Sequence, residues 1–316
     1  MKDVMVHSQS PPRNVRTPLE RAVLQTLLYY DIWGYPLTRA ELFCFLPLNG
    51  ISFDQFSTIL DETGPGPAVG ESEGYYFVRG RTSDVARARR EREENAARLW
   101  KKATLSMHVI KRFPFVRGVF VSGDLSKNAT TPESDIDFFI VTEPGRLWIS
   151  RSLLIAFKKL FLLNSRKYFC LNYLTARDHL EIDERNIFIA TEIAHLKPLY
   201  NTRLFHQYLK TNNWIQEYFP NFSLDYLRIP PVSNRKSILQ WCFELPFLIL
   251  PSNRIDRFLM DRMRRIWASR YPDFDDTTRK RIFRSTRTES RAYAGNYQDK
   301  ILSLYQSKLA EFGLDD

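Results

Sequence analysis

Two aspartates separated by one residue are the strongest candidates for chemistry in this sequence. Asp135 and Asp137 flank Ile136 and lead into an apolar run at 138–141. Because alternate side chains of a strand share a face, the two carboxylates should project together while Ile136 points the other way. Two carboxylates this close repel each other unless a cation joins them. Mg²⁺ prefers oxygen ligands and keeps positions open for phosphate, so the spacing predicts a Mg²⁺ site.

An apolar segment that ends in a glycine turn lies upstream of this pair. Residues 118–122 read Gly-Val-Phe-Val-Ser, and Gly123 and a polar stretch follow them. Glycine allows the backbone to approach a ligand closely, and the start of a short helix offers amide N–H groups to an anion. Ser122, Gly123, Ser126 and Lys127 are therefore candidate nucleotide-binding residues. Phosphate donors beside a metal pair are what nucleotidyl or phosphoryl transfer requires.

These two motifs together resemble a known signature. The order of an apolar strand, Ser122-Gly123-Asp124, a spacer and then Asp135-Ile136-Asp137 is similar to that of the DNA polymerase β-like nucleotidyltransferase superfamily, which includes kanamycin nucleotidyltransferases and CCA-adding enzymes. The resemblance covers about residues 115–175 and leaves the flanking regions unexplained. It implies a small mixed sheet and Mg²⁺-dependent transfer of a nucleoside monophosphate from a nucleoside triphosphate (NTP) to an acceptor hydroxyl, with release of pyrophosphate. Asp135 and Asp137 match the family's catalytic metal ligands.

The sequence departs from the family pattern at two positions. Asp124 stands where the family usually has Ser or Gly, and its carboxylate opposes a triphosphate unless it points away. The family's third carboxylate lies on a later strand, and the corresponding strand here is expected at 168–174. Its polar inward residue is Asn172, which can ligate Mg²⁺ but brings no charge and is no base. The alternatives, if that strand alignment differs, are Asp178, Glu181 and Asp183.

Three functions remain open at this point. The first is a Mg²⁺-dependent nucleotidyltransferase whose acceptor is RNA, protein or a small molecule. The second is a catalytically impaired relative that binds nucleotide or nucleic acid without turnover, which the residues Asp124 and Asn172 favour. The third is a protein-interaction scaffold that binds no nucleotide. Lys127 and Arg146 lie near candidate loops and could contact phosphate in the first two cases, or serve as ordinary surface cations.

The elements that must position this site indicate an α/β (α+β) chain. Its 316 residues, 44% hydrophobic, suit about two domains with real cores. The expected organisation is a disordered leader at 1–16, a winged-helix-like module at 17–82, a charged connector helix at 83–113, a nucleotidyltransferase-like domain at 114–200 and a helical C-terminal region at 201–316. A helix at 146–163 should precede the strand at 168–174, and helices are expected at 203–219 and 236–268.

Capping residues mark the N-terminal module. Thr17, Thr38 and Ser52 each precede a predicted helix, and residues 74–79 read as a strand. The layout resembles winged helix-turn-helix domains in general. The third helix, which would read DNA, carries Asp54, Asp61 and Glu62 but no Lys or Arg, so packing is favoured over DNA binding.

The basic residues of the C-terminal region leave several partners open. A predicted amphipathic helix alternates apolar residues with arginines and could pack on the transferase domain, contact acceptor RNA or touch lipid headgroups. Those arginines are Arg254, Arg257, Arg262, Arg264 and Arg265. A second cluster at 279–291 lies beside Phe283 and Tyr293 and suits single-stranded nucleic acid.

Composition narrows the class of partner and compartment. The net charge of +10 and the pI of about 9.5 favour polyanionic partners. The alternative is that the charge only keeps the protein in solution. The three cysteines form no CxxC pair, so a zinc site of the usual spacing is excluded and a reducing compartment is expected. No secretory signal and no transmembrane segment are recognisable, which predicts a cytoplasmic protein.

Overall fold

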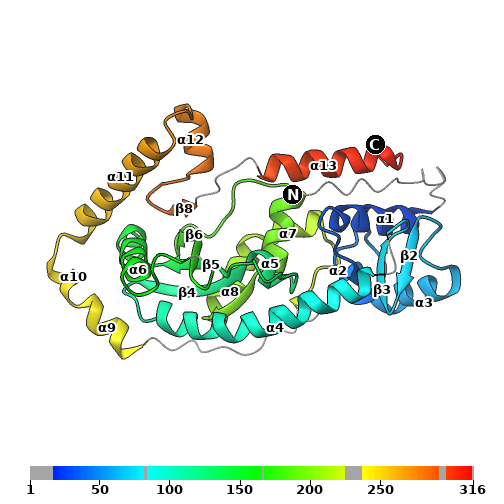
Figure 1. Cartoon of the computed structure of the whole chain (residues 1–316), viewed down its shortest axis with the longest axis horizontal. Coiled ribbons are helices and arrows are strands. Elements are labelled where there is room, and N and C mark those ends of the chain that lie inside the picture. Colours follow the sequence, from blue (N-terminus) through cyan, green and yellow to red (C-terminus); the bar gives the residue numbers. More distant parts are fainter. Residues whose placement is uncertain (1–16, 82–83, 166, 225–236, 292–296, 315–316) are drawn as a thin grey trace. The chain divides into compact units, whose positions relative to one another are not determined.

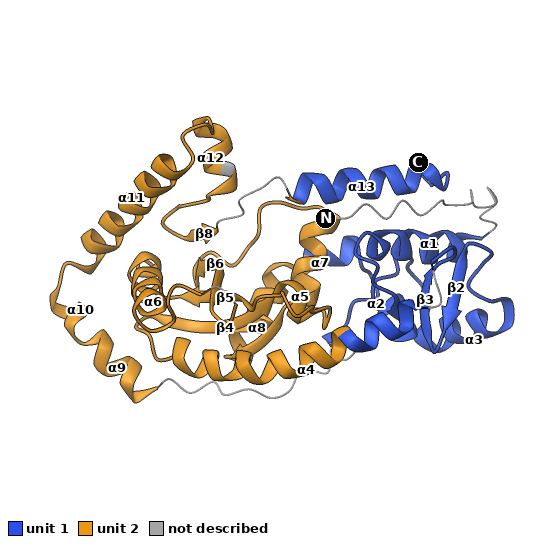
Figure 2. Ribbon diagram, viewed as in Figure 1, with its two compact units in different colours: residues 1–91, 214–228, 298–316 blue, residues 92–213, 229–297 orange. Residues whose placement is uncertain are grey.

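The chain divides into two compact units (Figure 2). The computed structural model describes residues 17–81, 84–165, 167–224, 237–291 and 297–314, so the leader expected at 1–16 lies outside the described residues. Unit 1 contains residues 1–91, 214–228 and 298–316, and unit 2 contains residues 92–213 and 229–297. The region 201–316, expected as one helical segment, therefore contributes to both units.

Unit 1 combines helices with a three-stranded antiparallel sheet (Figure 1). Its helices are α1 (Pro18–Asp31), α2 (Arg39–Cys44) and α3 (Phe53–Thr63). Its strands are β1 (Leu37–Thr38), β2 (Val69–Ser72) and β3 (Tyr75–Val78), in the order β1-β3-β2. The hairpin between β2 and β3 turns at Glu73 and Gly74, which both have positive φ, the conformation that tight two-residue hairpins require.

The three predicted helix starts are confirmed as capping boxes. In each one the cap hydroxyl accepts from the third backbone N–H while that residue's side chain accepts from the N–H of the cap. The pairs are Thr17 with Glu20, Thr38 with Glu41 and Ser52 with Gln55. The sequence marked these ends clearly because each cap is a local interaction between residues three apart.

The last helix of the chain, α13 (Tyr297–Glu311), completes unit 1 from residue 298 onward. Its Lys308 forms an ion pair with the buried Asp31 at 2.7 Å, and the ring of Tyr305 packs edge-on against Tyr29 at 5.2 Å. The Tyr305 hydroxyl also donates to the carbonyl of Gln25 at 3.3 Å. The first and last helices of the chain thus share one core.

Unit 2 is built on a five-stranded mixed sheet in the order β7-β4-β5-β6-β8, of which β4, β5, β6 and β8 are labelled in Figure 1. The strands are β4 (Val116–Ser122), β5 (Asp137–Thr142), β6 (Cys170–Ala176), β7 (Lys197–Tyr200) and β8 (Glu289–Arg291). β5 and β6 are parallel and are joined by α6 (Leu147–Phe161), whereas the other neighbours are antiparallel. The sequence did not predict β7, which lies within the region expected as a mixed sheet, or β8, which lies in the region expected to be helical.

Helices cover both faces of this sheet. On one face α6 and the part of α4 (Val85–Ile110) in unit 2 bury an apolar core that includes Val119, Ile136 and Phe138. On the other face α8 (Thr202–Thr211) places Phe205 and Tyr208 against aromatic rings of β4 and β5. Packed helices therefore support both faces of the sheet whose central strand, β5, begins at Asp137.

The remaining α-helices among the described residues of unit 2 are short, except for α11. They are α5 (Gly123–Ser126), α7 (Ile187–His195), α9 (Ile238–Glu244), α10 (Pro246–Ile249), α11 (Ser252–Arg270) and α12 (Asp276–Ile282). A single helix over 236–268 is therefore wrong. It breaks before Pro246 and Pro251, because proline lacks an N–H and disfavours helical geometry in the preceding residue.

The architecture confirms a chain of mixed helices and small sheets, as the α+β assignment predicted. No helix among the described residues is long and apolar enough to cross a bilayer.

Candidate metal and nucleotide site

Three strands bring the candidate residues to one end of the sheet of unit 2. In the antiparallel pair, Ser122 at the end of β4 lies opposite Asp137 at the start of β5. In the parallel pair, Asp137 lies beside Cys170 at the start of β6. Ser122, Asp137 and Cys170 therefore form a row across three neighbouring strands, and Asp135 lies two residues before β5.

The side chains of Asp135, Asp137 and Cys170 converge. One ligand atom of each lies within 4.8 Å of the others, and all three side chains are partly buried. Ile136 between the aspartates is fully buried in the apolar core on the opposite face. The predicted juxtaposition of the two carboxylates is thus present in the structure, with a thiol as the third group.

The glycine turn lies directly against this cluster. Gly123 has a φ of +67°, which side chains other than glycine rarely adopt. A Cβ added there would lie 2.5 Å from Oδ2 of Asp137. The turn between β4 and α5 therefore needs glycine for two reasons, its backbone conformation and the room taken by the Asp137 carboxylate.

The electrostatics of the cluster favour a cation. Burial and, next, the negative charge of Asp135 raise the pKa of Asp137 to about 7. Asp124 and Glu192 add to the rise, and a hydrogen bond from the Cys170 thiol opposes it. Burial and the Asp137 charge also raise the pKa of Cys170, so its proton is firmly held. A buried carboxylate with acidic neighbours is stabilised by a bound cation or by a proton.

The other predicted nucleotide-binding residues make contacts within the protein. The Ser126 hydroxyl donates to the carbonyl of Gly123 at 2.8 Å and is buried. The Ser122 hydroxyl is buried and lies 3.5 Å from the carbonyl of Asp137. Lys127 forms an ion pair with Glu192 at 2.6 Å. Ser122 and Gly123 border the aspartates, while Ser126 supports the turn from within.

Asp124, the first departure from the family pattern, is held by a neighbour. Its Oδ2 accepts a hydrogen bond at 3.1 Å from Ser134, which precedes Asp135. The contact ties the glycine turn to the loop that carries the aspartate pair. Its charge still acts on Asp137, so Asp124 adds to the negative field of the site.

Asn172, the predicted third metal ligand, occupies an irregular position of β6. Between Phe138–Leu171 and Phe139–Tyr173 the register shifts, and Asn172 is the extra residue. Cys170 occupies the position beside Asp137 instead. The ligand role of Asn172 stays a prediction, and no contact between its side chain and the aspartates is observed among the described residues.

The alternative acids lie toward the other end of the strand. Asp178, Glu181 and Asp183 follow the C-terminal end of β6, whereas Cys170 begins it. Glu181 forms an ion pair with Arg185, and Asp183 with Arg284. Arg146 likewise follows the far end of β5, where it donates to Asn253. None of these side chains joins the aspartate cluster.

Sequence reasoning missed Cys170 and Glu192. Cys170 shares strand parity with Asn172 and could have been weighed as an inward residue. Glu192 lies on α7, and no local pattern places it near Asp137.

The basic cluster at 279–291 is largely engaged by carboxylates. Arg284 pairs with Asp183 and Glu289, and Arg291 pairs with Glu184. The ring of Phe283 stacks on Trp267 at 4.5 Å and is buried, so it packs rather than offers a face to a base. Tyr293 lies outside the described residues. These contacts weaken the single-stranded nucleic acid interpretation, which stays a prediction.

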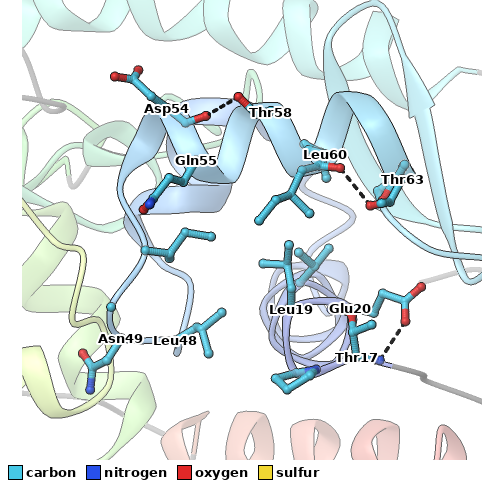
Figure 3. Close-up of a pocket in the computed structure, with 17 residues that line it drawn as sticks. Thr17, Leu19, Glu20, Leu48, Asn49, Asp54, Gln55, Thr58, Leu60 and Thr63 are labelled. Carbon is cyan, nitrogen blue, oxygen red and sulfur yellow. Dashed lines mark hydrogen bonds between the residues drawn. The ribbon is translucent and has the colours of Figure 1, made fainter.

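A groove of about 790 Å³ lies in unit 1, between the start of α1 and α3 (Figure 3). Most of its polar side chains make local helix contacts. Glu20 accepts from the N–H of Thr17, Thr58 donates to the carbonyl of Asp54, and Thr63 donates to that of Ile59. Because its lining is mainly apolar and these groups are engaged, the groove offers less for catalysis than the aspartate cluster does.

No protein-family model matches this chain, and neither a curated protein nor a solved structure matches it.

Proposed function

We propose that the protein is a Mg²⁺-dependent nucleotidyltransferase that moves a nucleoside monophosphate from an NTP to an acceptor hydroxyl. One observation carries the proposal: the carboxylates of Asp135 and Asp137 converge at the start of β5, directly against the Gly123 turn. The site thus supports a cation and a close backbone approach at the same place. The nucleotidyltransferase motif order, Ser122-Gly123 followed by Asp135 and Asp137, adds to it.

The residues present fit one Mg²⁺ ion. Asp135 and Asp137 supply the oxygen ligands that Mg²⁺ prefers, and a cation would offset the burial and the Asp135 charge that together raise the pKa of Asp137. The protonated thiol of Cys170 is a poor partner for this hard ion. When bound, Mg²⁺ supplies charge neutralisation and Lewis-acid polarisation of a phosphoryl oxygen.

The protein's own groups have distinct tasks under this proposal. Asp135 and Asp137 would hold the metal–nucleotide, and the Ser122–Gly123 turn would orient the phosphates for in-line attack by the acceptor hydroxyl. Pyrophosphate is the leaving group. The ion pair with Glu192 holds the Lys127 ammonium group near the negative charges of Asp124 and the aspartate pair.

A catalytically impaired relative, which binds nucleotide without turnover, is the second candidate function. Cys170 favours it, because a thiol stands beside Asp137 where a charged third ligand would help to bind metal and accept a proton. Cys170→Asp should raise turnover if this one residue limits it. Asn172→Asp is the matched control, since its position is displaced by the β-bulge. Equal effects of both would contradict the assignment of Cys170 as the third position.

For unit 1 we propose a winged-helix-like module that does not read DNA. The order α1-β1-α2-α3-β2-β3 with its terminal hairpin supports the winged-helix layout. On α3, Asp61 forms an ion pair with Arg39 at 2.6 Å, and no residue of this helix is basic.

A nucleotide-consuming enzyme with three free thiols also suits the reducing cytoplasm, the compartment we propose.

Label transfer tests the activity. The whole chain is incubated with each NTP labelled at the α-phosphate, Mg²⁺ and, separately, RNA, protein and small-molecule acceptor fractions. The proposal predicts Mg²⁺-dependent transfer of label with release of pyrophosphate, lost in Asp135→Asn/Asp137→Asn. Nucleotide binding without transfer to any fraction would favour the impaired relative.

A further inference from the structure

Helix α9 is attached to unit 2 through its polar side chains. Nε2 of Gln240 donates to the carbonyls of Phe113 and Val116, at 3.0 and 2.5 Å. One turn later, Oε1 of Glu244 accepts from the N–H of Phe115 at 2.7 Å. Both side chains are buried. A helix on the surface of a water-soluble domain is expected to bury its apolar side chains, whereas α9 buries polar ones.

The apolar side chains of α9 and α10 consequently face outward. Ile249 is 92% exposed, Leu248 79% and Trp241 56%. Ile238, Phe243 and Leu250 are also exposed. These residues fall within one stretch of thirteen positions, 238–250, along one side of unit 2 (Figure 1). Monomeric proteins rarely expose a large contiguous apolar patch unless it serves an interaction.

Helix α11 continues this stretch with basic residues on its outer face. Its inner face is fixed by Asp256, which accepts from the N–H groups of Trp148 and Ile149, and by the buried Met260. About half a turn away, Arg254, Phe258 and Arg262 are exposed at helical spacing.

Part of the outer face of α11 is hollowed. Phe258, Arg262, Arg265 and Ile266 contribute to an open groove of about 710 Å³. Within the described part of the chain, neither Arg254, Arg257 nor Arg262 has a carboxylate partner. Unpaired guanidinium groups next to exposed apolar side chains are suited to a surface that is both anionic and apolar.

We propose that α9, α10 and the outer face of α11, here called the α9–α11 surface, bind the face of an anionic phospholipid bilayer. Trp241, Leu248 and Ile249 would enter the boundary between headgroups and acyl chains, where amphipathic rings and aliphatic side chains are stable. Arg254, Arg257 and Arg262 would pair with phosphate and anionic headgroups. α9 and α10 have seven and four residues, too few to span a bilayer, so the contact is interfacial.

The apolar component decides between a membrane and a nucleic acid. Phosphates of RNA account for the arginines, and a base could stack on Trp241, but the most exposed apolar side chains of this surface are the aliphatic Ile249, Ile238 and Leu248, which offer no flat ring. A bilayer accounts for both the charge and the aliphatic side chains. The inference does not depend on the proposed transferase activity, because the residues that carry it are separate from the aspartate cluster.

Vesicle flotation of the whole chain tests this proposal. Vesicles of phosphatidylcholine alone are compared with vesicles that also contain phosphatidylglycerol. An apolar variant carries Trp241→Ser/Leu248→Ser/Ile249→Ser, and a charge variant carries Arg254→Glu/Arg257→Glu/Arg262→Glu. Matched controls use exposed residues elsewhere in unit 2, namely the triples Leu105→Ser/Leu160→Ser/Leu163→Ser and Lys101→Glu/Arg203→Glu/Lys210→Glu. Because every changed side chain is exposed, all variants should fold, and melting temperatures verify this.

The protein should float with the anionic vesicles and much less with phosphatidylcholine alone. Each arginine near an anionic surface contributes roughly five-fold, so the charge variant should lose roughly 100-fold in partitioning. The apolar variant should also lose flotation, and both controls should retain most of it. Absence of flotation, or equal losses in the control variants, would overturn the proposal. Flotation of both test variants at the level of the natural protein would also overturn it. So would binding of RNA in place of vesicles by the natural protein, or a lipid-free dimer of the natural protein that both test variants convert to a monomer.

Discussion

At the residue scale, the surroundings of Asp137 that suit it to bind a cation also destabilise the metal-free protein. Its carboxylate is held among acidic neighbours in a partly buried position, and its pKa is raised to about 7. An unfolded aspartate titrates near pH 4, so between about pH 4 and pH 7 the folded chain binds a proton that the unfolded chain lacks. Stability contributed by this group is therefore present at acid pH and is lost as pH rises through about 7.

Replacing Asp137 should consequently stabilise the metal-free protein. Asp137→Asn removes the buried charge, and we expect a gain on the order of 1–3 kcal/mol in the free energy of unfolding at pH 8, reduced by the solvent that still reaches the carboxylate. The gain should vanish toward pH 4. Urea denaturation across this pH range measures it, with the exposed Asp178→Asn as control. Equal stability of the variant and the natural chain at pH 8 would contradict the strained carboxylate.

Gly123 permits a second test that separates conformation from space. Gly123→Ala combines a positive φ with a Cβ 2.5 Å from Asp137 Oδ2, whereas Gly74→Ala has a φ of +78° and open space. The control should lose about 1 kcal/mol from backbone strain alone. Gly123→Ala should lose more and should also lose Mg²⁺-dependent nucleotide binding. Thermal unfolding with and without Mg²⁺–ATP compares them, and normal binding by Gly123→Ala would exclude a close approach at this turn.

The aspartate pair was predictable from the sequence because its geometry is local. Alternation along a strand is enough to place Asp135 and Asp137 together. Cys170 was not chosen, because its place beside Asp137 depends on the register between two strands and on a bulge at Asn172. Sequence alone does not fix the register of a parallel pair joined by a helix.

At the element scale, α6 obtains its N-terminal cap from another helix. Arg146 at its own cap position makes no side-chain capping bond, and Asp256 of α11 accepts from Trp148 and Ile149 at 2.8 and 3.0 Å. Asp256 is 1% exposed, and burial raises its pKa despite the two amide donors. This bond joins the crossover helix between β5 and β6 to the helix that carries the basic surface.

Removing this cap should destabilise unit 2. Asp256→Ala leaves two buried N–H groups without their acceptor, and we expect a loss of about 2–3 kcal/mol in the free energy of unfolding. Asp256→Asn keeps a carbonyl acceptor and removes the buried charge, so it should lose less than about 1 kcal/mol. Urea denaturation distinguishes the two, and similar losses in both would show that charge rather than capping holds α6.

Elements were predictable from sequence to the extent that their signals were local. The capping boxes at Thr17, Thr38 and Ser52 fixed three helix starts. The helix expected over 236–268 failed because its apolar and basic periodicity was given more weight than Pro246 and Pro251. β8, only three residues long, exists through its pairing with β6 and has no strong strand signal of its own.

At the scale of the whole molecule, unit 1 is assembled from segments far apart in the chain. Residues 17–91 pack with α13, which follows more than two hundred residues later. Sequence reasoning placed a domain boundary near 82 because it relied on local composition. Local composition does not show that the chain returns to unit 1 at α13. Long-range closure of this kind depends on complementary packing, such as that of Tyr305 against Tyr29.

This return predicts that α13 stabilises α1. Tyr305→Ala removes a buried ring and the hydrogen bond to Gln25, and should lower the stability of unit 1 by about 2–4 kcal/mol. Leu304→Ala changes a neighbour that is 40% exposed and should lose less than about 1 kcal/mol. Hydrogen exchange of the α1 amides reports the difference. Equal protection in the two variants would show that α13 does not stabilise unit 1.

Calorimetry can measure whether Asp135 and Asp137 bind a metal–nucleotide. ATP and GTP are titrated with and without Mg²⁺ into the natural protein and into Asp135→Asn/Asp137→Asn. We expect binding that requires Mg²⁺ and is absent from the double variant, although the variant remains folded. Binding of neither nucleotide to the natural protein, or equal binding to both proteins, would contradict it.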